Sequence, residues 1–393
     1  MRCRIDKTNC KIFLDLGKMP MANGFVDSKS LNKEYFYKLQ CAFNKKLSLF
    51  QLVNFPTPGK MFNKNYPFYT SSSRFMIKHF ENFSKMLKKK YLKKNSILLE
   101  IGSNDGTFLK NFNRKLSIGF EPSKSVHKIA VKKGLKSYNE FFNLKNISKL
   151  KKYYGKVDLI FGANVFCHIP DQVDLVKSIN KMLSKEGTIV FEEPYLGSMY
   201  KKVSYDQIYD EHIYMFSLTS IKKIYEKFGF ELIDASTQIT HGGSMRYILK
   251  RKGISKKTKN LIKLLNEEKK RKIDKFSACL QFKKNVINSK IKLRKKIKKI
   301  LKNKNKICGY GATSKSTTIL NFCNINKSMI DCIFDTTKDK IGKLTPGSHI
   351  PIVDYKFFKT SGYKNVFLFA WNHKKEILKK EKNKKIKWFS HIN

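Results

Sequence analysis

The feature that most constrains the fold is an apolar run that ends in a glycine-rich turn at residues 99–106, LEIGSNDG. Gly102 and Gly106 stand four positions apart, and the helix-like segment TFLKNF follows them. Glycines in such a turn let the backbone approach a ligand closely at the carboxyl end of a strand. The segment therefore predicts a strand–turn–helix unit of an α/β domain.

Further apolar runs alternate with helix-like segments along the chain. The runs are KLSIGFEPS, VDLIFGANV and GTIVFEEPY, and residues 72–94 and 171–184 have helical periodicity. This alternation predicts a parallel sheet with right-handed crossovers. A Lys-rich stretch at 253–303 predicts one or two amphipathic helices, and GYGATSKST with the later runs DCIFD, IPIV and NVFLFAW predicts a second α/β unit.

The expected fold class is therefore α/β, with a Rossmann-like doubly wound domain, a small N-terminal head and a second C-terminal α/β domain. We predict the boundaries 1–65 for the head, 66–252 for the doubly wound domain, 253–303 for a helical linker and 304–393 for the C-terminal domain.

An acidic residue follows the second apolar run at the spacing expected for nucleoside binding. Glu121, followed by Pro122, lies about 20 residues beyond the glycines, where a carboxylate can accept hydrogen bonds from both ribose hydroxyls. Glu100 precedes the turn, and Asn104 and Asp105 lie inside it. A carboxylate inside the turn would repel a pyrophosphate but could hold an ammonium group, which favours S-adenosylmethionine (SAM) over NAD. An ordinary strand–turn–helix remains the alternative.

Charge and hydropathy narrow the class of protein. Lys and Arg number 82 against 30 Asp and Glu, a formal net charge of +52. Such charge suggests nucleic acid, but the lysines are dispersed, so we predict a solvated surface, no nucleic-acid partner and attraction for an anionic small substrate. No apolar run reaches about 18 residues and no apolar signal core begins the chain, which predicts no membrane association and a cytoplasmic location.

Several motifs together resemble the sugar C-methyltransferases, a family of class I SAM-dependent methyltransferases. They are DLGKMPMANGF, YPFYTSSS, LEIGSNDGTFL, GFEPS, FGANVFCHIPD, EEPYLGSMYKKVSYDQIYDEH, HGGSMR, GYGATSKSTTILNF and FLFAWNHKKEI, and they cover nearly the whole chain. The resemblance implies transfer of a methyl group from SAM to carbon on a nucleotide-diphosphate ketosugar, in deoxysugar or polysaccharide biosynthesis.

The resemblance implies a catalytic base in the segment YDEH. The family pattern is Tyr-His-Glu-His, and here Tyr209, Asp210, Glu211 and His212 occupy it, so Asp210 replaces a histidine. His212 is the implied base that removes a proton beside the ketone, because an imidazole titrates near neutral pH. We expect the carboxylates to raise its pKa and Tyr209 to hydrogen-bond the enolate oxygen. A helix-capping turn is the alternative interpretation.

Other candidate residues follow from the same resemblance. Asn164 and His168 are expected between donor and sugar, with Asn164 also near the donor, and Tyr66 near the active site. The alternative for each is a structural role. Expected substrate contacts are His241, Gly242, Gly243, Ser244, Lys315, Trp371 and Asn372. The glycine turn at 309–317 also resembles an NAD site, but the resemblance assigns its domain to the nucleotide-sugar.

The family's head usually carries two Cys-x-x-Cys pairs that hold a structural zinc. Cys3 is followed by Asp6 where the second cysteine would stand, and Cys41 by Asn44, while Cys10 lies off the spacing. We therefore predict no bound metal and a head held by apolar packing. An RNA methyltransferase and a non-catalytic nucleotide-sugar-binding protein remain alternative functions, and the oligomeric state stays open.

Overall fold

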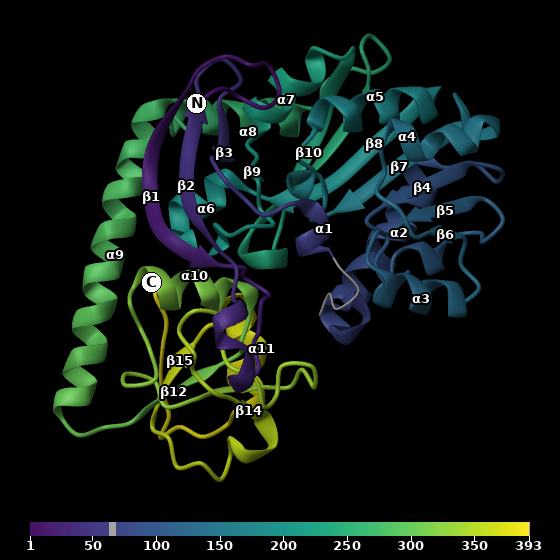
Figure 1. Cartoon of the computed structure of the whole chain (residues 1–393). Coiled ribbons are helices and arrows are strands. Elements are labelled where there is room, and N and C mark those ends of the chain that lie inside the picture. Colours follow the sequence, from purple (N-terminus) through teal and green to yellow (C-terminus); the bar gives the residue numbers. More distant parts are fainter. Residues whose placement is uncertain (63–67, 393) are drawn as a thin grey trace.

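The structure is a computed structural model that describes residues 1–62 and 68–392. In this part of the chain three sheets share the molecule, and the long helix α9 (Phe276–Lys302) runs beside two of them (Figure 1). No helix among the described residues combines the length and the apolar composition needed to cross a membrane.

The largest sheet has seven strands in the order β10-β11-β8-β7-β4-β5-β6. The five strands from β8 to β6 are parallel, and β11 is antiparallel to both of its neighbours. The strands are β4 (Ile97–Ile101), β5 (Ser117–Phe120), β6 (Ser137–Tyr138), β7 (Val157–Ala163), β8 (Leu183–Pro194), β10 (Phe230–Gln238) and β11 (Ser244–Arg251). The strand order reverses at β4, so the carboxyl ends of β4 and β7 border a crevice, which is where such sheets bind ligands.

Helices cover both faces of this sheet because its central strands are apolar on both sides. α2 (Arg74–Tyr91) confirms the helix predicted over 72–94; the Ser73 hydroxyl caps its first turn. Its Phe80 and Phe83 pack on Phe161 of β7 with ring centroids 6.1 and 5.3 Å away. The other helices of this region are α3 (Lys124–Lys132), α4 (Leu144–Ile147), α5 (Gln172–Met182), α6 (Leu196–Lys202) and α7 (Leu218–Glu226).

The head is an antiparallel sheet of β1 (Cys10–Pro20), β2 (Phe36–Asn44) and β3 (Leu49–Leu52), followed by the short helix α1 (Pro58–Met61). A fourth strand, β9 (Tyr214–Met215), comes from the segment directly after YDEH and pairs with β3. The head therefore shares a sheet with the chain around the implied base.

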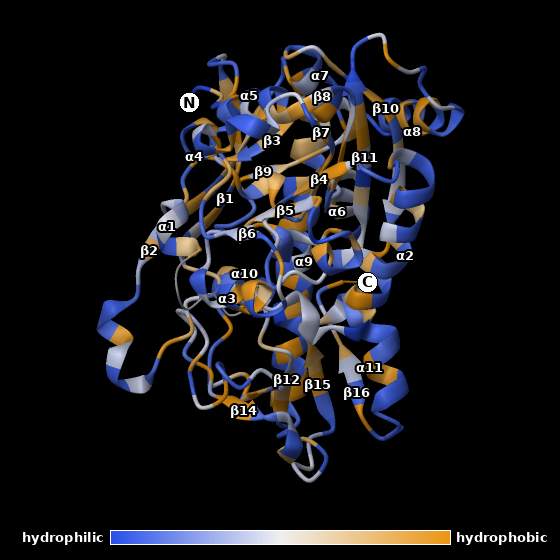
Figure 2. Ribbon diagram, turned by 90° about the vertical axis from the view of Figure 1, so that its right-hand side faces the viewer, coloured by the Kyte–Doolittle hydropathy of each residue, from blue (hydrophilic) through white to orange (hydrophobic). Residues whose placement is uncertain are grey.

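The Lys-rich stretch forms two helices, α8 (Lys259–Lys270) and α9, as the sequence predicts. The C-terminal sheet then has the order β14-β13-β12-β15-β16, with every pair parallel. Its elements are β12 (Ile307–Tyr310), α10 (Ser314–Phe322), β13 (Ile333–Asp335), β14 (Ile352–Asp354), β15 (Asn365–Leu368), α11 (Lys374–Lys380) and β16 (Lys387–Phe389). Figure 2 shows hydrophobic residues along the sheets and largely hydrophilic loops. The predicted fold class, with two α/β units and a small head, is confirmed.

Candidate active site

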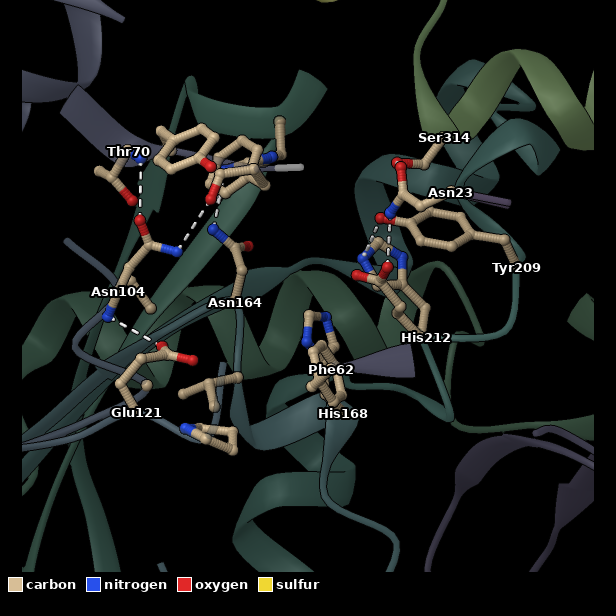
Figure 3. A pocket seen from close by; sticks show the side chains of 18 of the residues that line it. Asn23, Phe62, Thr70, Asn104, Glu121, Asn164, His168, Tyr209, His212 and Ser314 are labelled. Carbon is tan, nitrogen blue, oxygen red and sulfur yellow. Dashed lines mark hydrogen bonds between the residues drawn. The ribbon is translucent and has the colours of Figure 1, made fainter. Parts of the chain in front are cut away.

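A cavity of about 1300 Å³ lies where the three parts of the chain meet. Asn23 of the head, Glu121 and His212 of the seven-stranded domain and Lys315 of the C-terminal domain all line it. Pockets for one drug-sized ligand are roughly 300–1,000 Å³, so this cavity has room for two ligands. Figure 3 shows Asn104 and Glu121 on one side, Tyr209, His212, Asn23 and Ser314 on the other, and Asn164 and His168 between them.

The donor side is built on the ends of β4 and β5. Glu121 accepts the backbone N–H groups of Asn104 (2.9 Å) and Ser123 (2.7 Å), and burial raises its pKa to about 6. The Asn104 side chain bridges to the chain before α2, accepting from the Thr70 N–H and donating to the Phe68 carbonyl. Gly102 has φ +69°, and a Cβ there would lie 2.8 Å from a Val165 methyl, so only glycine fits. Gly102, Asn104, Glu121 and Pro122 line the cavity.

These residues fit SAM. A carboxylate at the tip of β5 faces the cavity beside a glycine turn, and the apolar side chains of Ile101, Phe120 and Phe142 line the same region, which suits a nucleoside.

Three sequence-predicted donor residues stand behind the cavity wall instead of lining it. Asp105 is fully buried and accepts hydrogen bonds from the Ser71 N–H (3.0 Å) and the Thr107 hydroxyl (2.6 Å). It therefore ties the glycine turn to the chain before α2, and the structure gives no support to its expected contact with a ligand ammonium. Glu100 is also buried, and burial raises its pKa well above the usual range. Gly106 faces Leu135, which a Cβ would approach to 2.2 Å.

The implied base, His212, is buried and held through both ring nitrogens. Nδ1 lies 2.7 Å from the Gln207 carbonyl oxygen, which can only accept, so Nδ1 carries the proton. Nε2 therefore keeps its lone pair and accepts from the Tyr209 hydroxyl at 2.9 Å. Burial, reinforced by the nearby His168, lowers the pKa of His212 well below its usual value. The expectation that neighbouring carboxylates raise this pKa is wrong, because Asp210 and Glu211 bind the head instead: Asp210 accepts the Ala22 N–H and Glu211 the Asn23 amide.

Two more neutral imidazoles border the centre of the cavity. His168 stacks on His212 (centroids 5.3 Å apart) and on Phe62 (5.6 Å), and burial lowers its pKa to about 3. Asn164, at φ +52°, follows β7 and donates its amide to His241 Nε2 at 2.7 Å. Burial and then Lys315 lower the pKa of His241 to about 3.

The predicted substrate residues divide between the cavity wall and its support. His241, Lys315 and Asn372 line the cavity, whereas Gly242, Gly243, Ser244 and Trp371 do not. The Trp371 indole N–H instead donates to the buried carboxylate of Asp206 at 2.6 Å. A Cβ at Gly242 would lie 2.2 Å from that indole, so the glycine makes room for it. Tyr66 falls outside the described residues.

Several lining residues are absent from the sequence-predicted site. Asn23 stands inside the motif DLGKMPMANGF, which marks the segment but does not single out the residue. Ser314 is the first residue of α10 and directly follows its N-cap, Thr313, inside the motif GYGATSKST. The other lining residues that no sequence pattern singled out include Phe62, Thr70, Thr313, Lys340 and His373.

The head does not contain the thiolate set that a structural zinc requires. Residues three apart on a strand point to opposite faces, and Cys41 packs into a different core from Cys3 and Cys10. Cys41 and Asn44, which occupy the positions of one family Cys-x-x-Cys pair, therefore do not face a common site. The Asn44 amide donates to the Thr8 hydroxyl at 2.8 Å and lies 3.8 Å from the Cys10 sulfur. A cluster of polar hydrogen bonds thus occupies this end of the head, while the absence of metal stays a prediction.

Comparisons with known proteins match the chain along nearly its whole length. Residues 3–62 match a family described as a zinc binding domain, residues 72–235 a methyltransferase domain, and residues 239–391 a C-methyltransferase C-terminal domain.

Individual relatives are similar over different shares of the chain. The C-methyltransferase NovU of Streptomyces niveus is 25% identical over 374 residues, covering 94% of this chain and 89% of the relative. A tRNA U34 carboxymethyltransferase of Sulfurimonas denitrificans is 30% identical over 116 residues, 28% of this chain and 39% of that protein. A SAM-dependent methyltransferase structure from Clostridium acetobutylicum covers 47% of this chain and 94% of its own, at 14% identity and a TM-score of 0.36. The glycine turn, the acid at the tip of β5 and the three family matches in this order show that the chain belongs to the SAM-dependent C-methyltransferases.

Proposed function

We propose that the protein methylates carbon on a nucleotide-diphosphate ketosugar. The observation that carries the proposal is a buried, neutral imidazole with a phenol hydroxyl on its Nε2, lining the same cavity as the donor-side carboxylate Glu121. Removing a proton from carbon beside a ketone requires such an unprotonated base.

His212 is suited to be this base. Its Nδ1 proton is fixed on the Gln207 carbonyl, which aims the Nε2 lone pair toward Tyr209 and the cavity. When a ketosugar enters, Nε2 accepts the proton of the carbon beside the ketone. The Tyr209 hydroxyl, released from the imidazole, donates a hydrogen bond to the developing enolate oxygen.

The donor would be held by Glu121, Gly102 and Asn104. SAM, when bound, supplies an electrophilic methyl group to the carbon nucleophile. Phe62 and His168 stack on each other and line the cavity, where their rings would keep water from the reacting carbon. Positioning of this kind supplies much of the acceleration in a two-substrate reaction.

The C-terminal domain would hold the nucleotide-diphosphate. α10 begins at Ser314 after the glycine turn, with Thr313 as its cap, and Thr313, Ser314 and Lys315 line the cavity. A helix N-terminus offers backbone N–H groups and a favourable dipole to phosphate. The strongly basic composition supports an anionic substrate in general terms. The proposal includes a cytoplasmic location.

The test is turnover with labelled SAM and a panel of nucleotide-diphosphate 4-ketosugars, followed by location of the new methyl group. His212→Ala should lower kcat by at least about 10³-fold and leave SAM affinity within a few-fold, because the base acts only in the chemical step. His127→Gln, on α3 and outside the cavity, is the matched control and should retain full activity. Turnover retained in His212→Ala would remove His212 from this role.

A second candidate, RNA methylation, is favoured by the net charge of +52 and by the 30% identity to a tRNA-modifying enzyme over 116 residues. It predicts methyl incorporation into bulk tRNA and none into the ketosugars. Binding of SAM and nucleotide-sugar without methyl transfer would instead indicate a non-catalytic binding protein.

A further inference from the structure

Ala22 and Asn23 of the head lie between helix α10 and residues 206–212, the segment that contains the implied base and is called the catalytic turn below. Ala22 is buried and Asn23 half-buried, and together they make four hydrogen bonds to the two elements. Asn23 also lines the cavity, as do Glu211 and Ser314. No catalytic step proposed above uses this segment.

The Asn23 amide has a fixed direction. Its Nδ2 donates to Glu211 Oε1 at 2.6 Å, since a carboxylate oxygen accepts. Its Oδ1 accepts from the Ser314 hydroxyl at 2.8 Å. One side chain therefore joins the first residue of α10 to the carboxylate that precedes His212 in the chain. Figure 3 shows Asn23 beside Ser314 and near His212.

The backbone of Ala22 is hydrogen-bonded on both sides, which fixes the position of the neighbouring Asn23 side chain. The Ala22 N–H donates to Asp210 Oδ1 at 3.1 Å, and the Ala22 carbonyl accepts from the Thr317 hydroxyl at 2.9 Å. Asp210 thereby has a structural use: its carboxyl oxygen accepts the head's N–H. A further hydrogen bond, from Thr318 to the Ile208 carbonyl, holds α10 directly to the catalytic turn.

We propose that Asn23 is a positioning residue that transmits occupancy of the C-terminal domain to Glu211 and the catalytic turn. A diphosphate at the start of α10 fixes the Ser314 hydroxyl, Ser314 fixes the Asn23 amide, and the amide fixes Glu211 beside the base. The inference rests on the proposed function for the identity of the ligand. Asn23, which the sequence analysis did not place in the site, would thus couple nucleotide binding in the C-terminal domain to the position of the catalytic turn.

The experiment combines turnover with a readout that needs no turnover. Hydrogen–deuterium exchange of the peptide covering residues 205–215 is measured with and without uridine diphosphate or thymidine diphosphate, in wild type, Asn23→Ala and Ser314→Ala. Asn321→Ala is the matched control, because this amide on α10 bonds two carbonyls within the C-terminal domain and does not line the cavity.

Asn23→Ala should retain SAM and nucleotide affinity within about threefold, lose the nucleotide-induced protection of residues 205–215, and lower kcat by about 10- to 100-fold with little change in KM. Asn23→Asp should lower kcat further, since it places a second carboxylate against Glu211. The double variant Asn23→Ala, Ser314→Ala should resemble the single variants because the two side chains act in series.

Protection and kcat within twofold of wild type in Asn23→Ala would overturn the inference, and so would the absence of nucleotide-induced protection in wild type. If wild type protects the peptide, Asn23→Ala does not, and no ketosugar is methylated, the inference stands and the proposed function fails.

Discussion

At the scale of the residue, burial decides the charge states in the cavity. His168, His212 and His241 all have a lowered pKa, and burial is the main cause in each case. The sequence could name these histidines from their motifs, but it could not show their surroundings. The acids beside His212 in the chain suggested a raised pKa, whereas their side chains bind the head. Adjacency in sequence is a poor guide to contact in a turn.

A pH profile checks the charge state of His212. Because the pKa of the imidazole is lowered below 6.5, the base stays neutral in mildly acidic solution, and kcat/KM should not fall until the pH drops below 6.5. Rates measured from pH 5 to 9 with a ketosugar substrate would show this. An acid limb centred above pH 6.5 would contradict the structural assignment.

Asp210 offers a second pH test at this scale. Burial raises its pKa to about 7 from 3.8, so the folded state favours the neutral carboxyl. The free-energy cost of burying the ionised carboxylate is absent below pH 3.8. It grows as the pH rises from 3.8 toward 7 and is complete above about pH 7. Asp210→Asn keeps a carbonyl oxygen for the Ala22 N–H and removes this cost.

Asp210→Asn should therefore become more stable relative to wild type as the pH rises from 4 to 7. The difference in their unfolding free energies should change by up to about 4 kcal/mol. Urea denaturation at several pH values measures it. A difference that is constant over this range would contradict the raised pKa.

At the scale of the element, the strand–turn–helix units were predictable because glycine turns and apolar runs are local signals. The head was less predictable. The register of β2 puts Cys41 and Asn44 on opposite faces of the strand, and the positions of the cysteines in the sequence do not reveal this. The pairing of β9 with β3 joins residues more than 160 positions apart and has no local signal at all.

Gly106→Ala tests the packing of the first glycine turn. Gly106 has φ +77°, and a Cβ would lie 2.2 Å from a Leu135 methyl, so backbone strain and overpacking should together lower the unfolding free energy by about 2–4 kcal/mol. Gly155→Ala is the control: its φ is +67° but no atom lies within 4 Å of the added Cβ, so it should cost about 1 kcal/mol. Equal losses in thermal or urea denaturation would show that packing on Leu135 contributes nothing.

At the scale of the whole molecule, the cavity depends on contacts between domains that the sequence leaves unspecified. Motifs indicated which residues belong to a site, but the placement of Lys315 and His241 in one wall depends on how the two α/β units pack. Asp206 and Trp371 illustrate this, since they hold the catalytic turn to the C-terminal domain from positions 165 residues apart. Burial alone would raise the pKa of Asp206, yet His391 and Trp371 keep it below the usual value.

Trp371→Phe should loosen that junction. It leaves a buried carboxylate oxygen of Asp206 without its 2.6 Å donor, at a cost of about 1–3 kcal/mol in unfolding free energy. Trp388→Phe, whose indole packs on Tyr310 with centroids 5.4 Å apart, is the aromatic control and should cost less. Calorimetry of both variants measures the difference, and a Trp371→Phe protein as stable as wild type would exclude a supporting role for this hydrogen bond.

The pairing of β9 with β3 has a consequence for catalysis. Residues 213–215 are joined to the head by the β9–β3 ladder and by a 2.8 Å hydrogen bond from the Leu52 N–H to the Ile213 carbonyl. The same segment is joined to the seven-stranded domain, because the Tyr214 hydroxyl donates to the Pro170 carbonyl at 2.6 Å. The backbone that follows His212 is therefore shared by the head and the seven-stranded domain. A change in the head that loosened this ladder would therefore disturb the imidazole and slow proton removal without altering any residue that lines the cavity.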